Sequence, residues 1–517
     1  MERKVFLAAI LSMLVLLGYN YFIAKVYRLE KPAVSTKESL PQKIPSIIAP
    51  QEIKPKSKLP SSISLEHNVL ENGDLKLVFT NLGGNLQEVY LKRFQHKFYE
   101  TSILSLEEFE DLPFQLIVNK EDRLVYVYED NLRKISKAFF LSNNSLDFEL
   151  GIQNLSAQPN NFNLKLDYFS LNLHSTQSNF QKNKNFLELS ISLPDKILRN
   201  NITRVAAKNF LLTQQKFNWL GLRERYFCSI FKPNTGPLGY YTQLIDNESV
   251  TVGMPIQILN LAPQTLANFK AKLYFGPQET QLLNSIDKDF GQIVNFGAFD
   301  PISKLLLSLL RWLHKFLPNW GLCILGVSLI LFFCLYPLTF KSLKSMKAMQ
   351  VLQPEIERLR KELKDQPQKL NREIMELYKK NKVNPFGGCL PMFLQIPIFF
   401  ALYQALLRSL DLRGAKFLWI KDLSEPDRLF TFESNLPLLG NEINLLPILM
   451  AIIMFFQQRL SSQSSAAVNP EQQKMMTIFF PILFGIMFYH VPSGLVFYWF
   501  VYSSLSLIVQ WKQTAKV

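Results

Sequence analysis

The side chains in this sequence that suggest chemistry are uncharged polar groups inside long apolar stretches. Ser328, Gln395 and Gln458 lie in three separate stretches, and Tyr498 and Gln510 lie in a fourth. An amide or hydroxyl without a partner is costly in an apolar medium, so these groups must pair with one another or face a hydrated cavity. Pairing is the ordinary explanation for any one of them. Their spread over several stretches favours a moderately polar cavity.

Other kinds of chemistry have little support. Ionisable side chains, which a channel, pump or secondary transporter normally places deep in its spans, are absent from the middle of these stretches. No carboxylate pair stands out among the scattered acidic residues, and the four cysteines form no CxxC pattern or disulfide framework. We therefore expect no catalytic residue, no metal site and no cofactor. A secondary transporter or channel stays open as an alternative, as does a tethered carbohydrate-active enzyme.

The apolar stretches have the length of membrane spans, since a helix needs about 20 apolar residues to cross the hydrocarbon core. The first follows Arg3 and Lys4, and all six cover roughly 5–24, 319–338, 389–408, 444–459, 476–490 and 493–511. A cleaved signal peptide is the alternative for the first stretch, but that stretch exceeds the usual apolar core and no clean small-x-small site follows it. The sequence therefore predicts six spans, with an uncleaved anchor at 1–25.

A linker and a β-rich domain separate the first two spans. Residues 26–60 are rich in Pro, Lys and Ser, which is the composition of an extended linker. From 61 to 290 apolar and polar residues alternate, as they do from Leu146 to Ile152, and Gly83-Gly84 and Asn143-Asn144 are turn signals. This pattern predicts a large antiparallel β-sandwich with a structural or partner-docking role.

Two helical segments flank the second span. Residues 301–317 form an amphipathic pattern that fits a helix in the membrane interface, or else an ordinary core-facing helix. Residues 340–387 carry twelve basic and six acidic side chains, and their leucine spacing breaks near Pro367, so they predict a cytoplasmic helical hairpin. With six spans, both termini are then cytoplasmic and the β-domain lies outside. We assign the net charge of +15 to this topology, not to DNA binding.

The basic outer face of the hairpin has two interpretations. It is either a solvated surface beside anionic lipid or a docking surface for ribosomal RNA or a targeting receptor. The candidate docking residues are Lys347, Arg358, Arg360, Lys361, Lys379 and Lys380.

Several strings of residues resemble one family. The most specific is KVNPFGGCLPMFLQIPIFFALY at 382–403, and weaker ones are Tyr336-Pro337-Leu338-Thr339, QQKMM at 472–476 and PSGLVFYW at 492–499. On these residues the chain resembles the YidC/Oxa/Alb family of membrane protein insertases, in its Gram-negative YidC form. The resemblance covers essentially the whole expected architecture.

The resemblance implies a fold class: a polytopic α-helical membrane protein with six spans, a five-helix insertase core at 319–511, and a large periplasmic antiparallel β-sandwich of the supersandwich type. It implies an inner-membrane location with a cytoplasmic tail at 512–517. The implied function is that of a chaperone, not an enzyme, which inserts and helps fold hydrophobic segments of new membrane proteins. The implied partners are nascent membrane proteins, the Sec translocon, a ribosome or targeting receptor, and membrane lipid.

The resemblance also implies a substrate groove with seven candidate residues. Ser328 matches a hydroxyl position of the family's groove. Gln395, Gln458 and Gln510 match amide positions, and Tyr498 and Trp499 match aromatic positions of the sixth span. Phe332 departs from the family, whose members usually carry arginine there. A groove without this charge cannot attract acidic substrate termini in the same way, so either uncharged polar groups suffice or a charge comes from elsewhere.

Overall fold

The computed structural model of the chain describes residues 65–514 apart from short gaps. The gaps are 100, 175–179, 181–182, 208–209, 235, 238, 247, 365, 385–389, 437–439 and 463–469. The expected anchor at 1–25 and linker at 26–60 lie outside the described residues. The same holds for part of the family string at 382–403.

Strands dominate the first part of the chain. They are β1 (His67–Glu71), β2 (Leu75–Thr80), β3 (Asn85–Leu91), β4 (His96–Lys97), β5 (Ser105–Leu106), β6 (Gln115–Lys120), β7 (Arg123–Glu129), β8 (Arg133–Ser142), β9 (Ser145–Asn154), β10 (Asn160–Asn172), β11 (Glu188–Ser192), β12 (Ile197–Asn201), β13 (Phe210–Thr213), β14 (Trp219–Arg223), β15 (Phe227–Pro233), β16 (Tyr240–Ile245), β17 (Ser249–Leu261) and β18 (Leu266–Pro277). Two short helices, α4 (Ile202–Ala206) and α5 (Thr280–Ile286), accompany them.

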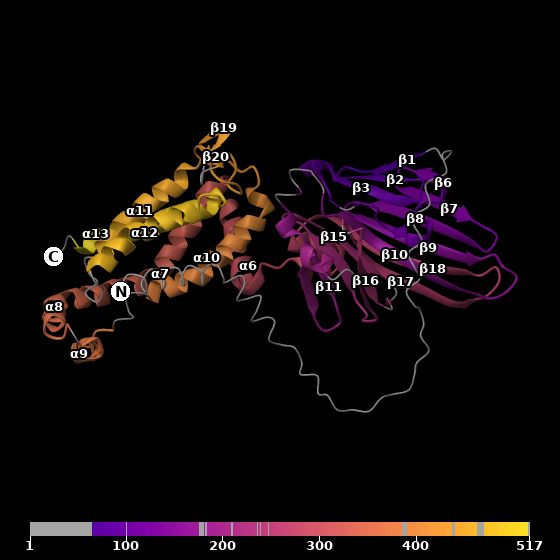
Figure 1. The fold of residues 1–517 in the computed structure, drawn as a ribbon. Helices are drawn as coiled ribbons and strands as arrows, with labels where there is room; N and C mark the ends of the chain where they lie inside the picture. Colours follow the sequence, from indigo (N-terminus) through magenta and orange to yellow (C-terminus); the bar gives the residue numbers. More distant parts are fainter. Residues whose placement is uncertain are drawn as a thin grey trace, which may run out of the picture. The chain divides into compact units, whose positions relative to one another are not determined.

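These strands form three antiparallel sheets. The largest has the order β12-β11-β14-β15-β18-β9-β8-β7-β6, the second β13-β16-β17-β10-β5, and the smallest β1-β2-β3-β4. Side chains from all three sheets, such as Phe79, Phe148 and Val252, share one buried apolar cluster. The antiparallel β-sandwich predicted from the alternating pattern is therefore confirmed, and Figure 1 shows these strands gathered in one layered body.

Local sequence explains where these strands turn. Gly83 and Gly84 connect β2 to β3 with φ of 64° and 58°, a conformation that glycine adopts without strain. Asn143-Asn144 connects β8 to β9 in register, so that Ser142 pairs with Ser145. Both turns were predicted from the sequence.

Two ionisable side chains are held inside the β-domain. The Lys137 ammonium donates to Asn85 Oδ1 at 2.7 Å and to two backbone carbonyls. Burial lowers the pKa of Lys137 to about 7. Burial also raises the pKa of Asp167 to about 7, although its carboxylate accepts a hydrogen bond from the Tyr241 hydroxyl, which acts in the opposite direction.

Helices make up most of the second part. They are α6 (Asp300–His314), α7 (Trp320–Val351), α8 (Gln353–Glu362), α9 (Pro367–Lys380), α10 (Leu390–Arg408), α11 (Leu445–Ser462), α12 (Pro470–Met487) and α13 (Ser493–Thr514), with the hairpin β19 (Phe430–Leu436) and β20 (Gly440–Ile443) before α11. In Figure 1 the long helices form one bundle, with α8 and α9 at the end opposite to β19 and β20.

Five of these helices coincide with the five apolar stretches predicted after residue 318. Among the described residues, Trp320–Val351 and Ser493–Lys512 are long and apolar enough to cross a membrane, whereas Leu394–Arg408, Leu445–Leu460 and Thr477–Met487 are shorter apolar helices. A β-rich domain followed by a helical region is thus the observed architecture. The count of six spans stays a prediction.

Helix α7 corrects one expected boundary. Its start is as predicted, because the Asn319 side chain accepts hydrogen bonds from the Gly321 and Leu322 amides and caps the helix. The apolar stretch was predicted to end near 338 and the hairpin to begin at 340, but the helix continues without a break to Val351. Residues 340–351 contain neither Gly nor Pro, so nothing in this lysine-rich segment stops the helix until Pro354.

The hairpin and the amphipathic helix follow the predicted pattern. α8 and α9 pack through Ile356, Ile374 and Tyr378. The first helix ends at Glu362 and the second begins at Pro367, as expected. Helix α6 buries Leu306 and Leu310 in the helical core and leaves Leu305 67% exposed. One helix therefore has both a core-facing surface and an exposed apolar surface.

Candidate functional site

Three helices of the bundle each bury an uncharged polar side chain, and two of these side chains meet. Ser328 on α7, Gln395 on α10 and Tyr498 on α13 are all buried. The Gln395 amide Nε2 donates to the Tyr498 hydroxyl at 2.6 Å. The Ser328 hydroxyl donates to the Ile324 carbonyl of its own helix at 2.7 Å. Pairing between helices, the ordinary explanation for a buried amide, therefore holds for Gln395.

Phe332 continues this cluster one turn along α7 from Ser328. Its side chain is only 4% exposed, and its ring centroid lies 5.7 Å from that of Tyr502, which is 6.2 Å from Tyr498. The next residue, Phe333, is 65% exposed. The position where the family usually carries arginine therefore faces the interior of the bundle, and here it is filled by a hydrocarbon ring. We call Ser328, Phe332, Gln395, Tyr498 and Tyr502 the polar column.

One hydrogen-bonding group of the polar column has no partner. Gln395 Oε1 is buried and accepts no hydrogen bond among the described residues. A buried polar atom left unpaired costs about 1–3 kcal/mol. Such atoms are uncommon in native structures and call for an explanation, such as water, strain or a ligand.

The other predicted groove residues lie elsewhere. Trp499 is next to Tyr498 in sequence but packs among Phe399 of α10, Phe484 of α12 and Phe488, which follows α12 directly. Gln458 lies near the end of α11, and Gln510 lies near the end of α13. A hydrogen bond and ring contacts thus connect three of the seven predicted residues, Gln395, Tyr498 and, through Tyr502, Phe332. Ser328 lies one turn from Phe332 on α7, and the other three lie elsewhere.

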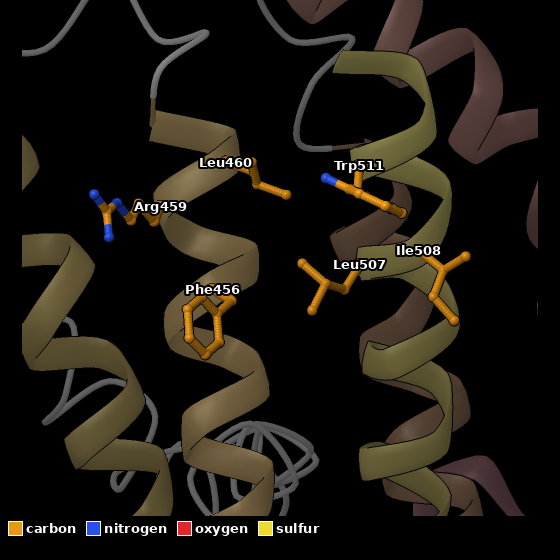
Figure 2. Close-up of a pocket in the computed structure, with 6 residues that line it drawn as sticks. All are labelled: Phe456, Arg459, Leu460, Leu507, Ile508 and Trp511. Atoms are coloured by element: carbon orange, nitrogen blue, oxygen red, sulfur yellow. The ribbon is translucent and has the colours of Figure 1, made fainter. Parts of the chain in front are cut away.

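A pocket of about 490 Å³ opens between the last turns of α11 and α13. Its lining residues, most of them apolar, are Phe456, Arg459, Leu460, Leu507, Ile508 and Trp511. Figure 2 shows Leu460, Leu507 and Trp511 directed toward the space between the two helices, whereas Arg459 points away from it. Sequence reasoning missed this pocket; the available signal was the large apolar residues next to Gln458 and Gln510.

The predicted docking residues of the hairpin lie on three helices. Lys347 is on the extension of α7, Arg358, Arg360 and Lys361 are on α8, and Lys379 and Lys380 are on α9. Arg358 pairs with Glu362 of its own helix at 2.8 Å. Lys379 lines a second pocket of about 500 Å³ beside Tyr378.

No group of three or more His, Cys, Asp or Glu side chains able to hold a metal ion occurs among the described residues. The polar column can donate and accept hydrogen bonds, but it contains no carboxylate, imidazole or thiol. The chemistry available there is the solvation of polar groups, not proton transfer or nucleophilic attack.

Two family models match this chain. The model described as "YidC periplasmic domain" matches residues 118–309, and the model described as "60Kd inner membrane protein" matches residues 312–517. The first covers most of the β-sandwich, and the second covers the helical bundle with the polar column.

Curated relatives and a solved structure match as well. The membrane protein insertase YidC of Janthinobacterium sp. is 37% identical over 303 residues, which are 58% of this chain and 52% of the relative. The membrane protein insertase YidC of Cupriavidus metallidurans is 40% identical over 296 residues, which are 57% of this chain and 50% of the relative. The chain thus spans about half the length of the curated relatives it matches. A crystal structure titled as an active YidC insertase is 17% identical, covers 86% of this chain and 92% of its own, and has a TM-score of 0.39.

These matches show a β-rich domain similar to the YidC periplasmic domain, followed by a helical region similar to the 60Kd inner membrane protein family. From residue 118 to its end the chain is therefore similar to proteins of the YidC family.

Proposed function

We propose that this protein is a membrane protein insertase. The observation that carries the proposal is the buried, uncharged polar column in a bundle of apolar helices, in a chain similar to proteins of the YidC family. Curated relatives that are 37% and 40% identical carry the name of this activity. A transporter is less well supported, because the column holds no charged group for an ion or polar solute.

The proposed topology has six spans. The first is the apolar stretch 5–24, and the other five correspond to α7, α10, α11, α12 and α13. The basic hairpin then lies in the cytoplasm, both termini are cytoplasmic, and the β-domain is periplasmic. The domain limits that go with this topology are 1–25, 26–60, 61–290, 301–317, 319–511 and 512–517.

The proposed mechanism uses physical partition, with no covalent step and no cofactor. Transfer of an apolar segment into lipid is favourable by about 0.8 kcal/mol per buried methylene, so it needs no other energy source. The obstacle is the polar flank of that segment, whose unpaired groups cost several kcal/mol each in hydrocarbon. The protein lowers this barrier by offering hydrogen-bonding partners inside the bundle.

Gln395 has the best-suited group for this task. Its unpaired Oε1 is an acceptor for a backbone N–H of the entering chain, and its Nε2 is held by Tyr498 at 2.6 Å, which orients the amide. Phe332 removes the charge attraction that the family's arginine would supply. We therefore propose that this protein favours clients with neutral polar flanks over clients with acidic ones.

The other parts have proposed partners. The basic residues Lys347, Arg358, Arg360, Lys361, Lys379 and Lys380 dock a ribosome or targeting receptor. The exposed apolar face of α6 at Leu305 contacts lipid, and the pocket at Trp511 receives the client at the cytoplasmic end of the bundle. The Sec translocon is a proposed partner for larger clients.

The test is complementation of a bacterial strain from which its own insertase can be depleted. The full chain is expressed during depletion, and the insertion of a small single-span protein is followed by protease protection. We expect insertion to be maintained by the chain and lost with the empty vector. Loss of insertion in both, with the chain present in the membrane at normal levels, would refute the proposal.

A further inference from the structure

Four arginines gather where the β-domain meets the end of α10. Arg199 is on β12, Arg223 is on β14, Arg225 lies between β14 and β15, and Arg408 is the last residue of α10. The Phe186 ring lies under two of them, with guanidinium carbons at 5.5 Å for Arg225 and 5.8 Å for Arg408. We call these four residues the arginine cluster.

Two members of the cluster, Arg223 and Arg225, have partners for their guanidinium groups. Arg223 is buried and donates to Glu188 at 3.0 Å, to Gln278 Oε1 and to the Asn295 carbonyl. Its role in the β-domain is accounted for by these contacts.

Arg225 joins the β-domain to the helical region. Its guanidinium donates to the Leu407 carbonyl at 3.0 Å, to the Ser424 carbonyl at 2.7 Å and to the Glu425 carboxylate at 2.8 Å. It therefore fixes the end of α10, and Arg408 with it, next to the β-domain.

The other two members keep unpaired donors. Nε and Nη1 of Arg408 and Nε of Arg199 are buried and have no hydrogen-bond partner among the described residues. Arg199 Nη2 donates to the Gln292 carbonyl at 2.9 Å. Burying a charged group without hydrogen-bonding partners is costly, so three such nitrogens in one cluster point to a missing acceptor.

The acidic groups nearby do not supply this acceptor. Glu188 is the carboxylate that acts on Arg199, Arg223 and Arg408 alike, and Arg223 Nη1 and the Ser190 hydroxyl already occupy its Oε1. Burial raises the pKa of Glu188, but Arg223 and Arg408 outweigh burial and hold it below its ordinary value. Glu425 pairs with Arg225 at 2.8 Å, and Asp300, which also acts on Arg199, pairs with Lys304 at 2.8 Å, so the cluster keeps an excess of positive charge.

We infer that the arginine cluster binds one phosphate-type oxyanion, held by Arg408 and Arg199. A phosphate group offers several acceptor oxygens to donors that come from different directions, and arginine is the side chain best suited to bind it. The negative charge of a phosphate group, about one to two elementary charges, offsets the excess positive charge of the arginine cluster. The group belongs either to a phospholipid headgroup at the end of α10 or to free phosphate. The inference goes beyond the proposed insertase function and does not depend on it.

The test uses the full chain purified in a neutral, phosphate-free detergent buffer. The first measurement is the thermal unfolding midpoint during titration with inorganic phosphate, compared with sodium chloride at equal ionic strength. A ligand that binds only the folded state raises the midpoint with the logarithm of its concentration. The second measurement is the amount of phospholipid that stays bound after extensive detergent washing, by native mass spectrometry.

The variants are Arg408→Gln, Arg408→Lys and, as a matched control, Arg311→Gln. Arg311 lies on α6 outside the cluster and pairs with Asp411 at 2.8 Å, so its replacement removes the same charge without touching the site. Arg408→Gln also removes an uncompensated buried charge. We therefore expect it to fold in phosphate-free buffer with a midpoint equal to or above that of the wild type.

Two results support the inference and separate the sources. A phosphate-dependent rise in the wild type and in Arg311→Gln that is at least halved in Arg408→Lys and absent in Arg408→Gln indicates free phosphate. Absence of that rise, with one tightly held anionic phospholipid lost only from the Arg408 variants, indicates a headgroup. If the wild type shows neither response, or if all variants respond equally, the inference is wrong and the cluster holds no anion.

Discussion

The hydrogen bond between Gln395 and Tyr498 allows the structural and functional roles of the polar column to be separated. The perturbations are Tyr498→Phe, Gln395→Leu and the two together. Tyr498→Phe removes only the hydroxyl that accepts from Gln395 Nε2 at 2.6 Å, and it leaves a second atom of a buried amide unpaired.

The expected magnitudes follow from burial. Gln395 is 5% exposed and Tyr498 is 0% exposed, so water cannot replace the lost partner without a rearrangement of the helices. Leaving a buried polar group unpaired costs about 1–3 kcal/mol, and we expect Tyr498→Phe to lower the free energy of unfolding by about 2 kcal/mol. The double variant replaces both partners with apolar groups, so we expect it to lie within about 1 kcal/mol of the wild type.

The assay has two readouts for each variant. Stability is measured by denaturant titration in mixed micelles, and insertion is measured by protease protection of a single-span client. If the column serves the client, the double variant is stable but inserts poorly, so the two readouts separate. A double variant that is both stable and fully active would refute the reasoning, because the polar column would then be dispensable.

Three further predictions concern single residues. The Asp427 carboxylate accepts from the Leu445 and Leu446 amides at 2.8 and 3.0 Å, so Asp427→Ala is expected to cost about 1–2 kcal/mol of unfolding free energy; an unchanged denaturation midpoint would contradict this capping role. The pKa of Asp167 is raised to about 7 in the folded state, so the folded chain binds more protons than the unfolded chain between about pH 4 and 7, and the stability that protonated Asp167 contributes is lost as the pH rises through this window. The difference in unfolding free energy between wild type and Asp167→Asn should therefore change by roughly 3–4 kcal/mol across it, and a pH-independent difference would refute the assignment. Phe332→Arg buries a charge among aromatic rings without a carboxylate, so we expect lower stability but better insertion of clients with acidic flanks; no change in client preference would show that this position does not contact clients.

The sequence predicts most of the fold, for physical reasons that particular residues illustrate. Period-two alternation from Leu146 to Ile152 predicts a strand with one buried face, and β9 is that strand. Gly83-Gly84 predicts a turn because other residues avoid the positive φ found there. The apolar stretch predicted at 319–338 does not show where the helix itself ends, because α7 continues through Pro337 into the lysine-rich segment and ends at Val351.

The candidate site is less predictable, since it depends on which residues of distant helices meet. Helix periodicity says that Tyr498 and Trp499 face different directions, but it does not say which of them meets Gln395 across 103 residues of sequence. Similarly, no local pattern brings Arg408 next to Phe186 of the β-domain. Such contacts follow from tertiary packing, which composition and spacing do not encode.

The central claim is that clients pass along the interior of the bundle at the polar column. The most direct measurement places a photoactivatable crosslinking residue at Phe332, which is buried in the column, or at its neighbour Phe333, which is exposed, and presents a radiolabelled single-span client on stalled ribosomes in native membranes. We expect crosslinks to the client from position 332 that disappear when the client lacks its apolar segment, with few from 333. Crosslinks from 333 alone would mean that clients travel along the outer face of α7, which would contradict passage through the polar column.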